Sequence, residues 1–354
     1  MVKNIGIDLG TSNVLINLYG KGIVLNEPAV VAMDTRTQEI IAVGKQAYDM
    51  LGRTPESIEV IRPLKGGVIA DFDVAEAMLL LFLERVHRRS FFSKPNVLIC
   101  TPASVSEIER LALIEAVERV GAGHIYIEEE AKVAGVGAGI DLLGTTARMV
   151  IDIGGGTSDV AVIVSGEVLV SESIKLAGDD FDAAIVQYFK DQFHVLIGER
   201  SAETVKKTVS TAKLLSEAEL VTYDIKGRDL LTGLPKSVNV TANQLYVALH
   251  PYFERIARVA KRILETLPPE VAADVIENGV ILTGGGALIY HMDTYLTEYL
   301  HVSVLRDEQP LNCVAIGTGL LLDMILSGKL ERTNPTWQQR WKRRWLRFKR
   351  RLMG

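Results

Sequence analysis

Two glycine-containing turns account for most of the chemistry that this sequence can support. Residues 152–159 read Asp-Ile-Gly-Gly-Gly-Thr-Ser-Asp and lie between two apolar, β-prone runs, 149–151 and 160–164. Three consecutive glycines carry no Cβ, so their backbone N–H groups can approach an anion closely. A carboxylate at the end of a strand, such as that of Asp152, can hold a hydrated Mg²⁺. Because hairpin turns also use glycine for steric reasons, this turn alone leaves the phosphate interpretation open.

The same pattern occurs a second time near the N-terminus. Residues 5–16 again read strand, Asp8, a glycine, small polar residues and strand, about one domain length before Asp152. A third glycine cluster, Gly284-Gly285-Gly286-Ala287, follows the apolar run 280–282 and opens a helical pattern, a geometry suited to an anion at a helix N-terminus. Together the three turns predict a nucleotide held between two related domains.

Phosphoryl hydrolysis needs groups that hold the phosphates, a metal that neutralises charge, and an oriented water. We expect Asp8 and Asp152 to hold the metal through water, although a turn-capping carboxylate is the structural alternative for both. The expected phosphate donors come from the two turns and are Thr11, Ser12 and Asn13 on one side and Gly154, Gly155, Gly156 and Thr157 on the other.

The composition is that of a large α/β protein. The chain has 354 residues, 48% of them apolar and 6% aromatic, which is enough for two domains with their own cores. Its two cysteines, Cys100 and Cys313, lie far apart, which fits a reducing compartment, and its six histidines form no zinc-ligand pair. No signal peptide is visible, and no apolar run approaches the ~18 residues that span a bilayer.

The net charge of −5 conceals an asymmetry between the C-terminal tail and the rest of the chain. Eight arginines and lysines between positions 340 and 351 contribute +8, so the remainder carries −13. An acidic body argues against nucleic-acid binding.

Apolar periodicity predicts the elements that position these turns. We expect a buried strand at 96–100, further strands at 125–127, 220–226, 237–240 and 302–305, and helices at 74–89, 131–139, 178–194, 201–216, 242–267 and 311–326. The helix 131–139 consists almost entirely of small residues, so it can pack closely and serve as a connector between the two halves.

Beyond the three turns, several longer runs carry a family resemblance. The chain resembles the actin, Hsp70 and sugar-kinase superfamily, and within it the MreB/Mbl-type bacterial actins, over residues 4–328. The specific runs are 22–28, 62–72 and 197–203. The resemblance implies a two-domain actin-like ATPase fold of class α/β, with duplicated mixed sheets flanked by helices and a nucleotide cleft between them. It implies domain I at 1–139 and 311–330, with a small subdomain at 33–72, and domain II at 140–310, with a small subdomain at about 180–265.

The resemblance also implies roles for individual residues, with ATP and Mg²⁺ as cofactors. Glu130 lies 22 residues before Asp152, the family's spacing for the water-positioning glutamate, with Glu129 second and Thr157 as the matching hydroxyl. From the residues alone, these glutamates read as an acidic first helical turn. The stretch Glu203, Thr204, Val205 and Lys206 is implied to face the ribose and purine, with Gly284, Gly285, Gly286 and Ala287 closing the adenosine side.

Residues 331–354 form a basic amphipathic segment. On a helical wheel, Trp337, Trp341, Trp345, Phe348 and Leu352 share one sector and cations occupy most of the rest, the composition of an interfacial membrane anchor. A nucleic-acid-binding arm and a partner-binding helix are the alternatives. Phe91 and Phe92 precede Lys94-Pro95, where the resembled proteins expose a membrane-touching loop; a buried pair is the alternative.

The resemblance therefore predicts a cytoplasmic weak ATPase that polymerises into paired protofilaments on the inner face of the plasma membrane and organises wall synthesis and cell shape. Its expected partners are copies of itself, anionic lipids, and RodZ-like and wall-synthesis membrane proteins, with no nucleic acid. An FtsA-like division actin is the alternative within the fold, and a small-molecule kinase the alternative of another class. The kinase would need an acceptor pocket and a catalytic carboxylate, for which we find no pattern.

Overall fold

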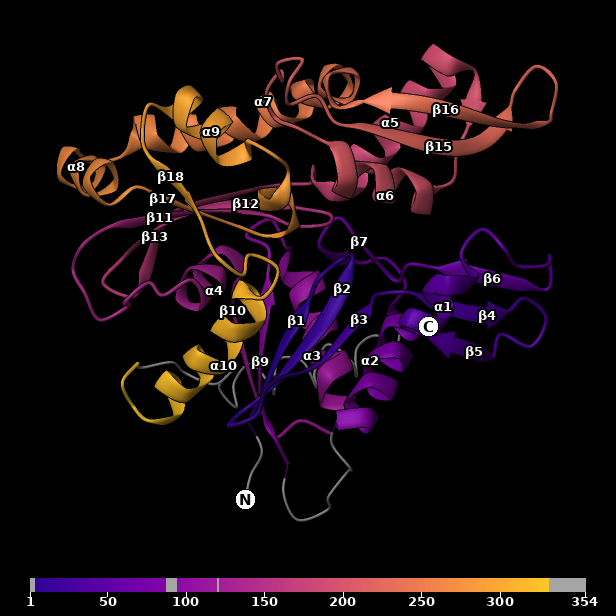
Figure 1. Ribbon diagram of the computed structural model, residues 1–354. Coiled ribbons are helices and arrows are strands. Elements are labelled where there is room, and N and C mark those ends of the chain that lie inside the picture. Colours follow the sequence, from indigo (N-terminus) through magenta and orange to yellow (C-terminus); the bar gives the residue numbers. More distant parts are fainter. Residues whose placement is uncertain (1–3, 87–93, 120, 331–354) are drawn as a thin grey trace.

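The structure, a computed structural model, describes residues 4–86, 94–119 and 121–330. Two mixed sheets, each flanked by helices, lie one above the other in the view of Figure 1. Within the described ranges, no helix is long and apolar enough to cross a membrane.

The two large sheets share one plan. The first has the order β10-β9-β1-β2-β3 and the second the order β13-β12-β11-β17-β18. In each, an antiparallel meander is extended by two strands parallel to its first strand. The first comprises β1 (Asn4–Leu9), β2 (Asn13–Leu18), β3 (Gly22–Pro28), β9 (Asn96–Thr101) and β10 (His124–Glu129). The second comprises β11 (Arg148–Ile153), β12 (Ser158–Val164), β13 (Glu167–Ile174), β17 (Val280–Thr283) and β18 (Val304–Arg306). The duplication expected from the sequence is thus present in the topology.

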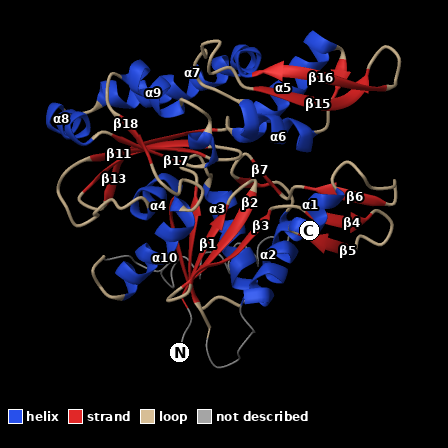
Figure 2. Ribbon diagram, viewed as in Figure 1, coloured by secondary structure: helices blue, strands red, loops and turns tan. Residues whose placement is uncertain are grey.

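A smaller sheet lies beside each large one, toward the right of Figure 2. One has the order β5-β4-β6, from β4 (Val31–Asp34), β5 (Ile40–Val43) and β6 (Ile58–Ile61), and packs against α1 (Lys45–Met50). The other has the order β14-β15-β16, from β14 (Val195–Leu196), β15 (Thr222–Asp229) and β16 (Pro235–Thr241). A short hairpin, β7 (Leu64–Lys65) and β8 (Val68–Ile69), follows β6. The exact domain boundaries remain a prediction.

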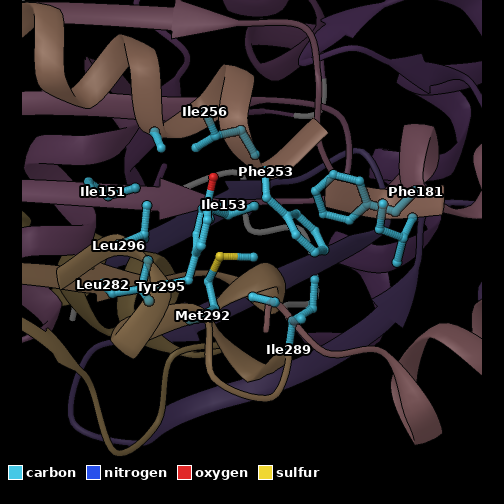
Figure 3. Close-up of a cluster of buried hydrophobic side chains, with 14 of the residues drawn as sticks. Ile151, Ile153, Phe181, Phe253, Ile256, Leu282, Ile289, Met292, Tyr295 and Leu296 are labelled. Carbon is cyan, nitrogen blue, oxygen red and sulfur yellow. The ribbon is translucent and has the colours of Figure 1, made fainter. Parts of the chain in front are cut away.

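Helices cover the faces of both large sheets. The first sheet carries α2 (Phe72–Val86) and α3 (Glu107–Arg119). The second half contains α5 (Gly178–Phe193), α6 (Glu199–Val209), α7 (Ala242–Thr266), α8 (Pro269–Asn278) and α9 (Met292–Leu300). Its core includes an aromatic cluster in which the Phe253 ring lies edge-on to Phe181 at 5.3 Å and contacts Tyr295 at 6.5 Å between centroids (Figure 3). These rings hold α5, α7 and α9 together in the core that covers one face of the second sheet.

Two helices, α4 (Glu130–Gly137) and α10 (Cys313–Leu326), lie between the halves and cross each other at glycines. A Cβ at Gly137 would lie 1.8 Å from the carbonyl oxygen of Cys313, and one at Gly317 would lie 1.9 Å from that of Val133. One apolar core cluster combines side chains of these two helices with others from β9, β11 and β12. The small-residue helix expected to connect the halves therefore does so through direct backbone contact with α10.

Two helix predictions were wrong. The helix expected at 201–216 is α6, which ends at Val209, because the backbone of the next residues pairs with Tyr290. Tyr290 N–H donates to Ser210 at 3.3 Å and Ala212 N–H donates to Tyr290 at 2.8 Å. The third glycine cluster opens only a four-residue 3₁₀ turn, η1 (Gly285–Leu288), and α9 begins later. That cluster is therefore a tight loop and not the start of an α-helix.

Candidate functional site

A cavity of about 470 Å³ lies between the two halves and is lined by residues of both. The first half contributes the β1–β2 turn and the N-terminal residue of α4. The second half contributes the β11–β12 turn, the third glycine loop and one face of α6. The sequence-predicted residues that line it are Asp8, Thr11, Ser12, Asn13, Glu130, Asp152, Gly154, Gly155, Gly156, Thr157, Glu203, Lys206, Gly284, Gly285 and Gly286. The three glycine-containing turns, which are far apart in the chain, thus meet at one cavity.

The two Asp-bearing turns touch each other. A Cβ at Gly155 would lie 2.1 Å from the Ser12 hydroxyl oxygen, and one at Gly156 would lie 2.6 Å from that of Thr11. The carbonyl of Gly155 accepts from the N–H of Asp179 at 2.8 Å, so this oxygen faces α5 and not the cavity. Glycine is therefore required here for close approach, and the turn presents a wall of backbone without side chains, as phosphate-binding loops do.

Of the four carboxyl groups that line the cavity, Asp8 and Asp152 are buried and Glu130 is partly buried, and none of these three forms an ion pair with a cationic side chain in the described structure. Burial raises the pKa of Asp8 to about 7. Burial and then the charges of Asp159 and Asp8 raise the pKa of Asp152 to about 8. Burial first, and then Asp159, Asp152 and Asp8, raise the pKa of Glu130 well above its usual range. Like charges in a low-dielectric site disfavour one another's ionised form, so a bound cation would be strongly stabilising here.

The donor set fits a hydrated Mg²⁺. Asp152 Oδ1 is buried and has no hydrogen-bond partner among the described residues. No group of three or more His, Cys, Asp or Glu side chains in the described ranges is arranged to hold a metal ion by itself. Mg²⁺ generally binds through one or two carboxylates together with waters and substrate phosphates. The protein therefore does not have to supply all the ligands of such an ion, and Asp8 and Asp152 could supply the carboxylates.

Glu130 and Glu129 occupy different environments. Glu130 is the first residue of α4 and lines the cavity, whereas Glu129 ends β10 beside Thr101. The change from strand to helix between them turns the two side chains in different directions. Of the two candidate water-positioning glutamates, the structure brings Glu130 to the cavity wall.

One buried carboxylate of the site was missed from the sequence. Asp159 is 2% exposed, faces Asp152 across the β11–β12 ladder, and accepts a hydrogen bond from the N–H of Ala103 at 3.3 Å. Burial raises its pKa to about 6. An acid at the start of the apolar run 160–164 was the available signal, since a carboxylate inside a buried strand needs a partner or a function.

The four residues predicted on α6, 203–206, lie on different faces of the helix, and only some of them line the cavity. Glu203 and Lys206 line the cavity together with Lys207, which was not predicted. Val205 is fully buried in the core, and the Thr204 hydroxyl donates to the carbonyl of Arg200 at 2.8 Å. Positions three and four apart share a helix face, so the residues between them cannot also reach the cavity. Ala287 is likewise 1% exposed and belongs to the core, not to the cavity lining.

Glu203 and Lys206 share a face of α6 but do not pair with each other. Lys206 Nζ donates to the Gly178 carbonyl at 2.8 Å and to Asp182 at 2.7 Å. Glu203 instead pairs with Lys207 at 2.6 Å. Lys206 therefore ties α6 to the first turn of α5, next to the glycine-rich turn.

Part of the cavity wall is apolar. This part comes from η1 and from the segment leading into α10, and none of its side chains was predicted. They are Leu288, Ile289, Pro310, Leu311 and Val314. A cavity with both an apolar wall and a polar, glycine-lined wall suits a ligand with a flat ring and a charged tail.

The expected membrane-contacting residues Phe91, Phe92, Trp337, Trp341, Trp345 and Phe348, and the whole segment 331–354, lie outside the described residues.

Comparisons with known proteins agree on one family. Residues 2–329 match the model of the MreB/Mbl protein family. The chain is 50% identical over 323 residues to the cell shape-determining protein Mbl of Bacillus cereus, covering 91% of this chain and 96% of that one. It is 42% identical over 328 residues to the cell shape-determining protein MreB of Escherichia coli, covering 91% and 94%.

Solved structures give the same result. The crystal structure of MreB5 of Spiroplasma citri bound to AMPPNP superposes with a TM-score of 0.88 at 38% identity, covering 93% of this chain and 98% of that one. The MamK double helical filament has a TM-score of 0.78 at 20% identity, covering 91% and 99%, and shows the fold alone. The expected actin-like α/β fold is confirmed.

Proposed function

The chain belongs to the MreB/Mbl protein family, and on that premise we propose that it is an ATP-binding, filament-forming protein that determines cell shape. The observation that carries the proposal is the cavity itself. Two Asp-bearing turns meet the third glycine loop at the cavity, and apolar side chains form another part of its wall. The solved relative bound to AMPPNP supports an adenine nucleotide as the ligand.

In the proposed complex, the β1–β2 and β11–β12 turns hold the phosphates through backbone and hydroxyl donors, and Asp8 and Asp152 hold Mg²⁺ through water. Mg²⁺ supplies the positive charge that offsets the phosphates and the buried carboxylates. Lys206 is fixed by Asp182 and Gly178 beside the glycine-rich turn, which keeps a cation near the phosphate end. The base and ribose occupy the apolar end, against η1 and α6.

Glu130 is the proposed water-positioning residue, with Thr157 opposite it. Its carboxylate lies at the cavity wall at the start of α4, where it can accept a hydrogen bond from a water directed at the terminal phosphate. Because α4 is packed directly against α10, the position of this carboxylate is tied to the contact between the two halves. We propose slow hydrolysis, linked to filament turnover.

Filament formation is proposed from family membership and from the solved filament of a protein with the same fold. We propose paired protofilaments of this chain on the cytoplasmic face of the plasma membrane. The sequence of residues 337–352, with its tryptophans and cations, supports binding to anionic lipids. RodZ-like and wall-synthesis membrane proteins are the proposed partners, and organisation of wall synthesis is the proposed role.

Electron microscopy of the purified full-length protein tests the proposal. The protein is imaged with Mg²⁺·ATP, with Mg²⁺ alone, and with Mg²⁺·ATP plus liposomes containing anionic lipid. We expect filaments that require nucleotide and that align on the liposomes. Nucleotide binding is measured in parallel, with Asp152→Ala as the variant that should lose the Mg²⁺-dependent part. Absence of both nucleotide binding and filaments would rule the proposed function out.

A further inference from the structure

The two small sheets are joined by a side-chain contact across the outer end of the cavity. The Tyr48 hydroxyl, on α1, donates a hydrogen bond to the Glu203 carboxylate on α6. The guanidinium of Arg200, one turn earlier on α6, lies 4.9 Å from the centroid of the Tyr48 ring and donates to the Asp49 carbonyl at 3.2 Å. We call these four residues the cross-cleft contact.

Glu203 belongs both to this contact and to the cavity. Its side chain lines the cavity wall, whereas Tyr48 is not part of the lining. Burial would raise the pKa of Glu203, but hydrogen bonds from Lys207 and Tyr48 outweigh burial and hold it below its usual range. Burial and the neighbouring Glu203 carboxylate raise the pKa of Tyr48 to about 12, so its hydroxyl keeps its proton and remains a donor. Any effect of Tyr48 on a bound ligand must therefore act through Glu203.

The helix that carries Tyr48 is fixed to the first half. The N–H of Lys45 donates to Glu27 at 2.7 Å, and Arg85 of α2 donates to the same carboxylate at 3.2 Å. Glu27 belongs to β3, whose neighbouring residue Asn26 lines the cavity and accepts from Asn13 of the β1–β2 turn at 2.8 Å. A rigid connection thus runs from the polar end of the cavity through β3 to α1.

The parts of the contact differ in strength. The Arg200–Asp49 ion pair is 3.6 Å long and its side chains are 31% and 49% exposed, so it contributes little by itself. Glu203 is 22% exposed, and a hydrogen bond between a neutral donor and a partly buried carboxylate is among the stronger kinds. The Tyr48–Glu203 hydrogen bond is therefore the part whose loss should be measurable.

We propose that Tyr48 is a positioning residue for the bound nucleotide: its hydrogen bond across the cleft fixes the Glu203 carboxylate at the cavity wall and holds the two small sheets together, so that nucleotide release requires this contact to break. The inference rests on the proposed nucleotide site. It adds a residue outside the cavity that controls release, and it links occupation of the cavity to closure of the outer end of the cleft.

The test compares Tyr48→Phe with wild type in stopped-flow release of a fluorescent ATP analogue with Mg²⁺, below the concentration at which the protein sediments as filaments. Phe keeps the ring that Arg200 contacts and removes only the hydroxyl. We expect release about tenfold faster (about 1.4 kcal/mol) and an association rate within about twofold of wild type. Tyr19→Phe, at an exposed turn position, is the matched control and should change neither rate.

A double-mutant cycle separates positioning from packing. In a Glu203→Ala background the acceptor is absent, so Tyr48→Phe should no longer accelerate release. If Tyr48 acted only through packing of α1, the substitution would have the same effect in both backgrounds. An unchanged release rate in the wild-type background, or equal effects in both, would overturn the proposal.

A distance measurement tests closure independently of nucleotide affinity. Spin labels at Arg36→Cys and Ser237→Cys, both exposed, report the separation of the two small sheets by pulsed electron paramagnetic resonance; the native Cys100 and Cys313 are buried. Tyr48→Phe should lengthen or broaden this distance, and an identical distribution would contradict the proposed contact. If wild type bound no nucleotide, the proposed function would fail, while the distance comparison would still decide whether the contact holds the sheets together.

Discussion

Gly317→Ala tests the close crossing of α4 and α10. The added methyl carbon would lie 1.9 Å from the Val133 carbonyl oxygen, whereas ordinary C···O contacts are about 3.3 Å or longer. The two helices would therefore have to separate by about 1.4 Å, the difference between these distances. Both clashing groups are fixed to backbones, so no change of rotamer can relieve the overlap.

Two opposing effects determine how much Gly317→Ala changes the free energy of unfolding. Alanine is the better helix former by about 1 kcal/mol in a helix interior, which would stabilise α10. Overpacking in a close-packed core costs about 3 kcal/mol at the upper end of its usual range, which applies here because the atoms cannot move aside. We therefore expect Gly317→Ala to lower the free energy of unfolding by about 2 kcal/mol, the difference between the two effects.

Denaturant unfolding measures this change, with Gly144→Ala as the control. A Cβ at Gly144 would meet its nearest atom, the Asp141 carbonyl oxygen, at 3.5 Å, so this variant should resemble wild type. Because Glu130 begins α4, separation of α4 from α10 should also displace the Glu130 carboxylate. A displacement of about 1 Å can slow a reaction about 100-fold, so the proposed ATP hydrolysis should slow as well. A Gly317→Ala protein as stable as wild type or more so would refute the reasoning, because it would show that the added methyl group causes no costly overlap with the Val133 carbonyl.

Four further predictions concern charge. Asp152→Ala should weaken Mg²⁺-dependent nucleotide binding roughly tenfold; equal affinities with and without EDTA in wild type would contradict this metal assignment. Glu130→Ala should slow phosphate release about 100-fold while nucleotide affinity, measured by titration, stays near that of wild type; unchanged turnover would exclude the water-positioning role. Burial raises the pKa of Asp182 to about 6, so the folded protein binds this proton more tightly than the unfolded chain and stability falls as pH rises from about 4 to about 6. Between wild type and Asp182→Asn, the difference in unfolding free energy should therefore change by about 2 kcal/mol across that range, and a pH-independent difference would show that this carboxyl is not buried as described. Deleting residues 335–354 should abolish most co-sedimentation with anionic liposomes, since each cation near such a surface contributes about 1 kcal/mol; full co-sedimentation of the truncated protein would assign the segment to another partner.

Local sequence patterns were sufficient to predict those features of the fold and the site that a few consecutive residues determine. An Asp at the end of an apolar run followed by glycines and small hydroxyl residues can form only a few turns. For that reason the two Asp-bearing turns were found from the sequence, and all their predicted residues line the cavity. The sequence likewise placed α7 within one residue of its observed bounds. Helical periodicity indicated its length, and Thr241, which forms a capping box with Gln244, marks its start.

Predictions failed where a residue's environment depends on distant segments. The end of α6 is set by pairing with Tyr290, about eighty residues further along the chain, so periodicity could not locate it. The division of the stretch 203–206 into cavity-facing and buried positions depends on how α6 is rotated against the core. Asp159 was missed because only the neighbouring strand and the Ala103 N–H explain how its carboxylate is accommodated.

The sequence by itself determined the two Asp-bearing turns with their carboxylates and the third glycine cluster, since these follow from local sterics and short apolar runs. The duplicated mixed sheets were expected from the family resemblance. Only the tertiary structure decided which side chains face each other across the cleft. Tyr48 and Glu203 are 155 residues apart, and Gly317 lies against Val133 from another segment. Contacts of this kind depend on how two halves, each stabilised by its own core, settle against each other. No local pattern encodes that arrangement, which fixes both the shape of the cavity and the contact that closes its outer end.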